Sequence, residues 1–82
     1  TYVIIRWKNT ATADYIQLYR SMTGKKYSMI MDSKITKKNK KGVVVKYQYA
    51  NGVYRFKIRA YNRSGRKKFF GKFSSVKKVR LK

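Results

Sequence analysis

The residues of this sequence that could do chemistry are cations placed at every second position. Arg55, Lys57 and Arg59 alternate with apolar residues, and Tyr61 continues the same spacing. In an extended strand, residues two apart project from one face at intervals of about 6.6 Å. That interval suits the successive phosphates of an extended polyanion, and an aromatic ring among the charges can stack on bases or sugars. We therefore predict a polyanion-binding surface here, with a merely solvated outer sheet face as the alternative.

A second group of cations follows directly in the sequence, around the turn signal Ser64-Gly65. Basic clusters of this kind can bind phosphate groups, although short lysine runs are also common in solvent-exposed loops without a binding role. The complete predicted polyanion-binding set is Arg55, Lys57, Arg59, Tyr61, Arg63, Arg66, Lys67 and Lys68.

The composition argues against catalysis. The sequence has no His and no Cys, and its only carboxylate side chains are those of Asp14 and Asp32. Acid–base, thiol and metal chemistry depend on such groups. Neither aspartate has a plausible catalytic partner, so we interpret both as turn residues. The sequence therefore predicts a protein that is not an enzyme and that holds no metal and no cofactor.

The charge balance of the whole chain points to anionic partners. Lys and Arg number 23 against 2 acidic residues, which gives a net charge of +21 over 82 residues. Such an excess attracts anionic polymers over long distances. Hydrophobic residues make up 43% of the chain, far more than in disordered charged segments, so a folded core is expected. A chain of this length has room for one domain.

The sequence carries little information about the compartment. No apolar run approaches the ~20 residues of a membrane-spanning helix, so we expect no membrane insertion. No cleavable signal is visible. The chain starts at Thr1 rather than Met, which we interpret as a piece cut from a longer polypeptide.

Hydrophobic residues recur with a period of two, which is typical of strands with one buried face. We therefore predict an all-β protein, an antiparallel two-sheet β-sandwich of six or seven short strands. The predicted strands cover the ranges 3–7, 15–20, 26–31, 43–49, 54–61 and 69–81, the last interrupted at Gly71 and at Ser74-Ser75. Their inward side chains should form one core that contains Trp7, Ile16, Leu18, Tyr54, Phe56, Ile58 and Val79.

Turn signals separate these strands. The Lys-rich segment 32–42 is predicted to be a solvated loop, and Ser64-Gly65 to be the tip of another turn. Asn51-Gly52 lies between two apolar runs and is the strongest short-range signal for a reversal of antiparallel strands. We therefore expect such a reversal at this point.

Four segments follow the pattern of one known domain family. They are 5–7, 16–21, 24–27 and 52–62, the last followed by Gly65 and by 71–74. They resemble the fibronectin type III domain, of the lysine- and tyrosine-rich kind found as repeated modules in surface and secreted proteins of Gram-positive bacteria. The resemblance implies a single fibronectin type III-like, immunoglobulin-like domain over residues 1–82, as one module of a longer protein.

The resemblance also assigns roles to two aromatic residues. Trp7 corresponds to the core tryptophan of the family's second strand, and Tyr54 to a corner tyrosine whose hydroxyl bonds back to the preceding loop. The family's first strand should precede Trp7 by several residues, yet this chain begins almost on the tryptophan strand. That first strand is therefore truncated, disordered or supplied differently.

In function, the resemblance implies a noncatalytic module of a multidomain cell-surface or secreted protein, a spacer, scaffold or adhesion unit that is extracellular or in the cell wall. Its partners would be neighbouring domains or anionic polymers, either cell-wall polymers or acidic glycans. The residues alone leave a second class open, a small nucleic-acid-binding β-domain of the OB or SH3-like kind. A sandwich with Trp7 in its second strand would favour the first class, and a closed barrel would favour the second.

Overall fold

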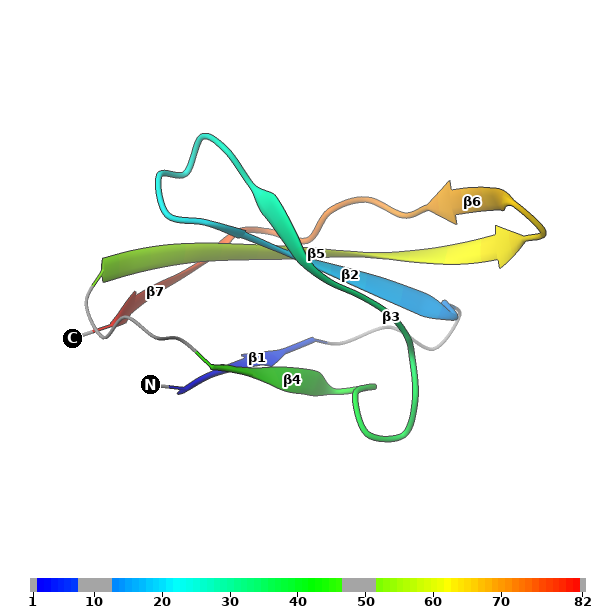
Figure 1. Ribbon diagram of the computed structural model, residues 1–82, viewed down its shortest axis with the longest axis horizontal. Coiled ribbons are helices and arrows are strands. Elements are labelled where there is room, and N and C mark those ends of the chain that lie inside the picture. The colour runs from blue at the N-terminus through cyan, green and yellow to red at the C-terminus, as the bar shows by residue number, and fades with distance from the viewer. Residues whose placement is uncertain (1, 8–12, 47–51, 82) are drawn as a thin grey trace.

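The fold consists of strands, as the period of two predicts. The computed structural model describes residues 2–7, 13–46 and 52–81, and in these ranges it contains seven strands and no helix. The strands are β1 (Tyr2–Arg6), β2 (Tyr15–Ser21), β3 (Ser28–Lys34), β4 (Gly42–Lys46), β5 (Gly52–Ser64), β6 (Lys67–Phe70) and β7 (Lys77–Leu81). Every pairing between them is antiparallel, and they form two sheets (Figure 1). The prediction of an all-β sandwich is confirmed.

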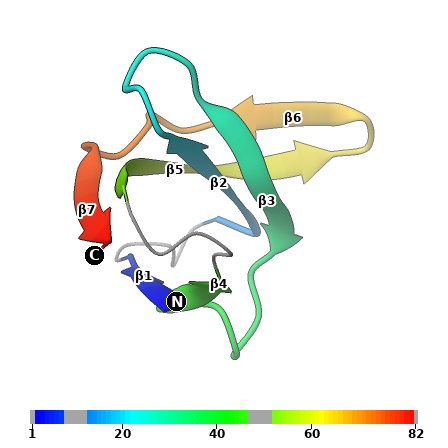
Figure 2. The same cartoon turned by 60° about the vertical axis from the view of Figure 1, so that its left-hand side comes forward.

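The two sheets differ in size. The small sheet pairs β1 with β4, and the large sheet has the order β3, β2, β5, with β6 and β7 both paired to β5. Because β5 is 13 residues long, its second half can pair with β6 while its first half pairs with β7. Figure 2 shows β1 and β4 facing the arch formed by the strands of the large sheet.

The core lies between the sheets and contains the residues that the alternation points inward. Ile16 and Leu18 of β2 have no exposed surface, and Tyr54 and Phe56 of β5 are 1% exposed. Val3 and Ile5 of β1 also belong to this core, as does Trp7, the residue that directly follows β1. Ile58 and Val79 are only partly buried, yet both pack against this cluster. The predicted core is therefore confirmed, with these last two residues at its margin.

The predicted bounds of the third strand, residues 26–31, are wrong. β3 begins at Ser28 and continues through Asp32 to Lys34, where a loop was expected from residue 32 onward. Asp32 lies directly opposite Gln17 of β2 and accepts a hydrogen bond from its amide. Asp32 is thus a strand residue rather than a turn residue, because a partner on the neighbouring strand satisfies its carboxylate.

The Asn51-Gly52 signal does not join two strands of one sheet. β4 pairs with β1, whereas β5, which begins at Gly52, pairs with β2, β6 and β7. The expected reversal between paired strands is therefore wrong, because the chain passes from the small sheet to the large one here. Residues 47–49, which were assigned to the fourth strand, lie outside the described residues.

The irregular edge formed by β6 and β7 stays bonded to β5 throughout. The turn predicted at Ser64-Gly65 is confirmed, with φ of +61° at Gly65. The predicted interruption is also present, over residues 71–76. Within it, the amide of Gly71 donates to the Ala60 carbonyl at 2.8 Å, and that of Ser74 to the Ile58 carbonyl at 2.7 Å. The segment therefore holds its side chains against the large sheet.

Candidate polyanion-binding face

The predicted cations of β5 share the outer face of the large sheet. Arg55, Lys57 and Arg59, called the β5 strip below, alternate with residues that point to the core and are all half-buried. Residues directly opposite each other on neighbouring strands share a face of the sheet. The register therefore sets two rows across the strands, one of Asp32, Gln17 and Arg59 and one of Tyr15, Tyr61 and Phe70.

Arg59 is held by other side chains of the face. Its Nε donates to Gln17 Oε1 at 2.8 Å, and its Nη2 donates to the Tyr19 hydroxyl at 3.2 Å. The guanidinium carbon lies 3.8 Å from the ring centre of Phe70 and 4.7 Å from that of Phe73. Each cation–π contact of this kind contributes about 0.5 to 2 kcal/mol, more when the pair is desolvated. Arg59 therefore stabilises the outer face of the sheet.

The other two cations of the β5 strip also have partners within the molecule. The Lys57 ammonium lies 4.2 Å from the ring centre of Tyr27 and 4.1 Å from that of Phe73. Arg55 Nη1 donates to the Met22 carbonyl at 3.4 Å. The structure thus brings the β5 strip together as the spacing predicts, but aromatic rings cover two of its three charges.

Tyr61 is the buried centre of the second row. Its side chain is 4% exposed, and its ring stacks on that of Tyr15 with centroids 5.0 Å apart. Its hydroxyl donates to Asp32 Oδ1 at 2.5 Å, and Asp32 Oδ2 also accepts from Gln17 Nε2 at 3.2 Å. The Lys68 ammonium lies 4.0 Å from the same carboxylate. Because Tyr61 is covered, stacking on a ligand requires other rings of this face.

The contact between Tyr61 and Asp32 shifts the pKa of both groups. Burial, followed by the hydrogen bond to Asp32 and its negative charge, raises the pKa of Tyr61 to about 12. Burial alone would raise the pKa of Asp32, but that pKa is lowered, because hydrogen bonds from Tyr61 and Gln17 and the charges of Lys68 and Arg63 outweigh burial. The pair is thus held as a neutral phenol beside a charged carboxylate.

The hydrogen bond between Tyr61 and Asp32 predicts that the stability of the fold depends on pH in the alkaline range. The folded-state pKa of Tyr61 is raised above its ordinary value of 10.0. The stabilisation linked to it is therefore complete below pH 10.0 and is lost as the pH rises through about 12. Tyr61→Phe should have a lower melting temperature than the native chain at neutral pH, and this difference should shrink across that window. Circular dichroism melts at a series of pH values measure it.

The matched control for that series is Tyr27→Phe, which removes a phenol from the same face without touching Asp32. The difference in melting temperature between Tyr27→Phe and the native chain should not become smaller over the same pH range. A difference for Tyr61→Phe that stays constant from neutral to strongly alkaline pH would contradict the assigned hydrogen bond.

The remaining predicted residues lie where a ligand can reach them. All four cations of the β5–β6 hairpin, called the hairpin cations below, are exposed, namely Arg63, Arg66, Lys67 and Lys68. β2 pairs with β5 only as far as Tyr61, so the hairpin projects beyond β2 (Figure 1). Arg63 Nη2 donates to the Gly65 carbonyl at 3.4 Å, which orients one of these side chains along the turn. The hairpin cations offer the more accessible half of the predicted set.

The prediction from sequence missed the side chains that organise this face. Gln17 is 4% exposed, an unusual position for an amide, and it links Asp32 to Arg59. Tyr19 donates a further hydrogen bond to Gln17 at 2.9 Å. The available signal was the spacing of Tyr15, Gln17 and Tyr19, which alternate with the core residues of β2. Only the register shows that these three side chains lie beside the β5 strip on the same face of the large sheet.

The described part of the chain contains no group of three or more His, Cys, Asp or Glu side chains that could hold a metal ion. Among the residues that the structure places, no helix has the length and apolarity needed to cross a membrane.

Comparison of the chain with models of protein families, with curated proteins and with solved structures finds no match.

Proposed function

We propose that this chain is a noncatalytic β-sandwich module of a multidomain protein at the cell surface, in the cell wall or secreted. Its positive surface binds anionic polymers, either cell-wall polymers or acidic glycans. The observation that carries this proposal is the set of exposed hairpin cations on a projecting turn. The Asp32 carboxylate, which lies near these cations, already accepts hydrogen bonds from Tyr61 and Gln17. Asp32 also lies 4.0 Å from the Lys68 ammonium, but its single negative charge faces four hairpin cations, so this end keeps a net positive charge that attracts an anionic polymer.

The strand pairing supports the fibronectin type III resemblance. In immunoglobulin-type sandwiches, the second and fifth strands share one sheet, and the third, sixth and seventh share the other. Because β1 ends next to Trp7, it corresponds to the second strand of that sandwich. Counting on from it, β4 corresponds to the fifth strand and β5 to the sixth. The pairings of β1 with β4 and of β5 with β2 and β6 then fit that pattern, whereas β3, in the fourth place, pairs with β2 in the large sheet instead of joining β1 and β4.

The two aromatic residues of the resemblance also support it. Trp7 is 7% exposed and belongs to the core, and Tyr54 is 1% exposed. The loop that would accept the Tyr54 hydroxyl falls partly in 47–51, outside the described residues, so that bond stays a prediction.

The nucleic-acid alternative has less support from the fold. OB and SH3-like domains are barrels in which strand pairing closes or nearly closes the sheet. In the described part of this chain, the small and large sheets share no strand pairing. Nucleic acid is therefore kept as one arm of the binding experiment.

The proposal predicts weak, charge-driven binding centred on the hairpin. Replacing Arg66 and Lys67 together by glutamine should weaken binding to heparin, teichoic acid and DNA by similar factors. For DNA, the slope of log affinity against log salt should become shallower by about two, one unit for each lost phosphate contact. Fluorescence titrations over a range of NaCl concentrations measure both quantities.

The matched control replaces Lys25 and Lys26 by glutamine, which removes the same charge from the exposed β2–β3 loop. This variant should change the salt slope much less than the hairpin variant does. Equal effects of the two variants would place the binding elsewhere than on the hairpin. Tight binding to one polymer and none to the others at low salt would contradict a general polyanion surface.

A further inference from the structure

The outer face of the small sheet carries apolar side chains where a solvated face normally carries polar ones. In β1 and β4 the apolar residues do not alternate with polar residues but form the continuous runs 3–5 and 43–45. Such runs are typical of strands that are covered on both faces. Ile4 is 56% exposed although both of its neighbours pack into the core, and Val44 is 60% exposed. The middle residue of each run therefore points away from the core.

These two residues lie directly opposite each other in the register of β1 on β4. Opposite residues of an antiparallel pair share one face of the sheet, with their Cβ atoms about 5 Å apart. Ile4 and Val44 thus form one apolar surface, called the Ile4–Val44 patch below. A strand added to either edge of the small sheet would lie in the plane of the sheet and would leave this face uncovered. A cover for the patch has to come from outside the sheet.

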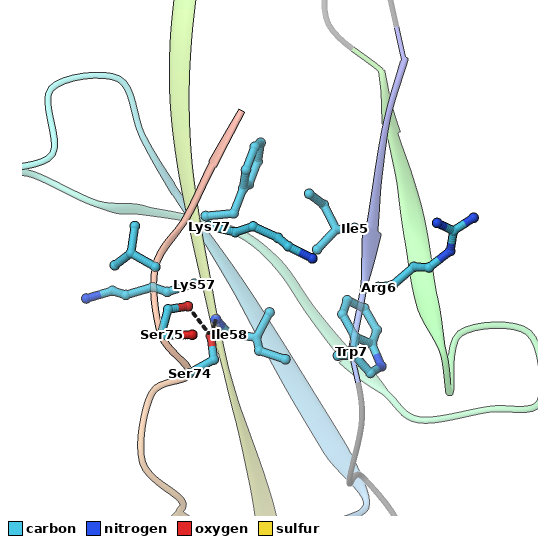
Figure 3. Close-up of a pocket in the computed structure, with 10 residues that line it drawn as sticks. Ile5, Arg6, Trp7, Lys57, Ile58, Ser74, Ser75 and Lys77 are labelled. Carbon is cyan, nitrogen blue, oxygen red and sulfur yellow. Dashed lines mark hydrogen bonds between the residues drawn. The ribbon is translucent and has the colours of Figure 1, made fainter. Parts of the chain in front are cut away.

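Three exposed cations border the Ile4–Val44 patch. An open depression of about 490 Å³ extends from the patch to the loop before β4, and its lining includes Arg6, Lys38 and Lys41. Arg6 lies opposite Gly42, which has no side chain, and it extends toward β4, away from the pocket drawn in Figure 3. Neither aspartate of the chain lines the depression. The rim of the patch is therefore positive without a compensating acid.

The loop between β3 and β4, which carries two of these cations, is held by Asn39. The Asn39 Oδ1 accepts a hydrogen bond from the Thr36 amide at 2.7 Å, and its Nδ2 donates to the carbonyl of the last residue of β3 at 3.0 Å. The Trp7 amide donates to the Lys41 carbonyl at 3.0 Å, which ties the end of the loop to the chain just after β1. The backbone of Lys38 and Lys41 is thus positioned before any ligand binds, which lowers the entropic cost of binding.

Charge and area decide which kind of partner suits this surface. A second copy of the chain would bring another net charge of +21 toward a positive rim, and like charges repel. A stable protein–protein interface covers about 800 Å² on each partner, far more than two aliphatic side chains provide. A lipid surface needs less, because the burial of a few apolar side chains adds to the attraction of each nearby cation to anionic headgroups.

We propose that the Ile4–Val44 patch and its positive rim dock this domain on the surface of a lipid bilayer that contains anionic lipids. Ile4 and Val44 enter the boundary between headgroups and acyl chains, and Arg6, Lys38 and Lys41 contact the lipid phosphates. Long cationic side chains suit this position, since their alkyl stems lie along apolar surface while the charged ends stay in water. The domain lies on the bilayer and inserts no membrane-spanning segment. The patch is separate from the hairpin cations, so this proposal and the proposed function can fail independently.

The direct test places a polarity-sensitive dye on the patch. The chain has no Cys, so a single introduced cysteine can be labelled specifically. With vesicles of phosphatidylglycerol and phosphatidylcholine in equal parts, a dye on Val44→Cys should shift its emission to the blue, and a quencher attached to the acyl chains should quench it. A dye on Ser64→Cys, in the turn of the β5–β6 hairpin, should show neither change. Vesicles of phosphatidylcholine alone should shift neither dye.

A double variant separates insertion from charge attraction. Ile4→Thr combined with Val44→Thr keeps β-branched side chains that suit a strand, and should weaken binding to the anionic vesicles at least about tenfold. The same variant should bind heparin within about twofold of the native chain, because it leaves every cation in place. A circular dichroism melt shows whether it folds. If it does not fold, the two labelled variants decide the question.

The positive rim is tested by removing its charges. Replacing Lys38 and Lys41 together by glutamine should weaken binding to the anionic vesicles by roughly fivefold for each lost charge. The matched control replaces Lys25 and Lys26 by glutamine, which removes the same charge from the exposed β2–β3 loop. This control should weaken vesicle binding much less, because that loop lies on the large sheet, away from β1 and β4 (Figure 1).

Four results would overturn the proposal. The first is equal vesicle binding of the native chain and the Ile4→Thr, Val44→Thr variant, which would show attraction by charge alone. The second is a blue shift of the dye at Ser64 in place of the dye at Val44, which would assign the membrane contact to the hairpin. The third is a shift at Val44 that grows with protein concentration without vesicles, which would assign the patch to a second copy. The fourth is a shift at Val44 with a soluble amphipathic peptide of leucine and glutamate but not with vesicles, which would assign the patch to an acidic protein.

Discussion

Leu18→Ala is expected to destabilise the fold by about 3 to 5 kcal/mol, a large part of the total stability of a small domain. Leu18 has no exposed surface and lies in the central part of β2, opposite Ile58 of β5 and Met31 of β3. Truncation there leaves a cavity between the two sheets that neighbouring strands cannot fill without breaking their pairing. Chemical denaturation followed by tryptophan fluorescence, with Trp7 as the probe, measures the change.

Two further variants calibrate this expectation. Met29→Ala, on β3, should change the free energy of unfolding by less than about 1 kcal/mol, because Met29 is 49% exposed. Ile58→Ala should fall between the two, because Ile58 lies at the margin of the core and lines a groove of about 400 Å³ between β1 and residues 74–77. If Ile58→Ala were as costly as Leu18→Ala, the groove would not be the open space that the structure shows.

Gly42→Ala is expected to separate β1 from β4. Gly42 has φ of +150°, which L side chains rarely adopt, and it lies directly opposite Arg6. A Cβ at this position would be 2.2 Å from the Ile5 carbonyl oxygen and 2.9 Å from the Arg6 Cα. Both are backbone atoms of the partner strand, so no side-chain rotation relieves the clash. We expect a loss on the order of 3 kcal/mol or more in the free energy of unfolding.

The control is the same substitution at a glycine with positive φ but open surroundings. Gly65 has φ of +61°, and a Cβ there would have no neighbour within 4 Å. Gly65→Ala should therefore cost only about 1 to 2 kcal/mol, the penalty of the left-handed conformation. Hydrogen exchange should show that Gly42→Ala exposes the amides shared by β1 and β4 while β2 and β5 stay protected. Equal losses for the two glycine variants would contradict the close approach of the strands.

The sequence predicts which cations of β5 share one face, but it does not predict which of them a ligand can reach. Alternation places Arg55, Lys57 and Arg59 on one face because side chains of a strand point to opposite sides in turn. Whether a cation is free depends on which side chains the fold brings to it. Arg59 meets Phe70 and Gln17, which belong to β6 and β2, and no local pattern contains those contacts.

The sequence by itself determined the strand type, the inward set of β2 and β5 and the large positive charge, because these follow from side-chain alternation and composition alone. The tertiary structure decided which strands pair and that β4 pairs with β1 rather than with β5. It also decided that Asp32 lies in a strand, where it accepts a hydrogen bond from Tyr61. Strand pairing depends on hydrogen bonds and packing between segments far apart in the chain, and local propensity does not encode that choice.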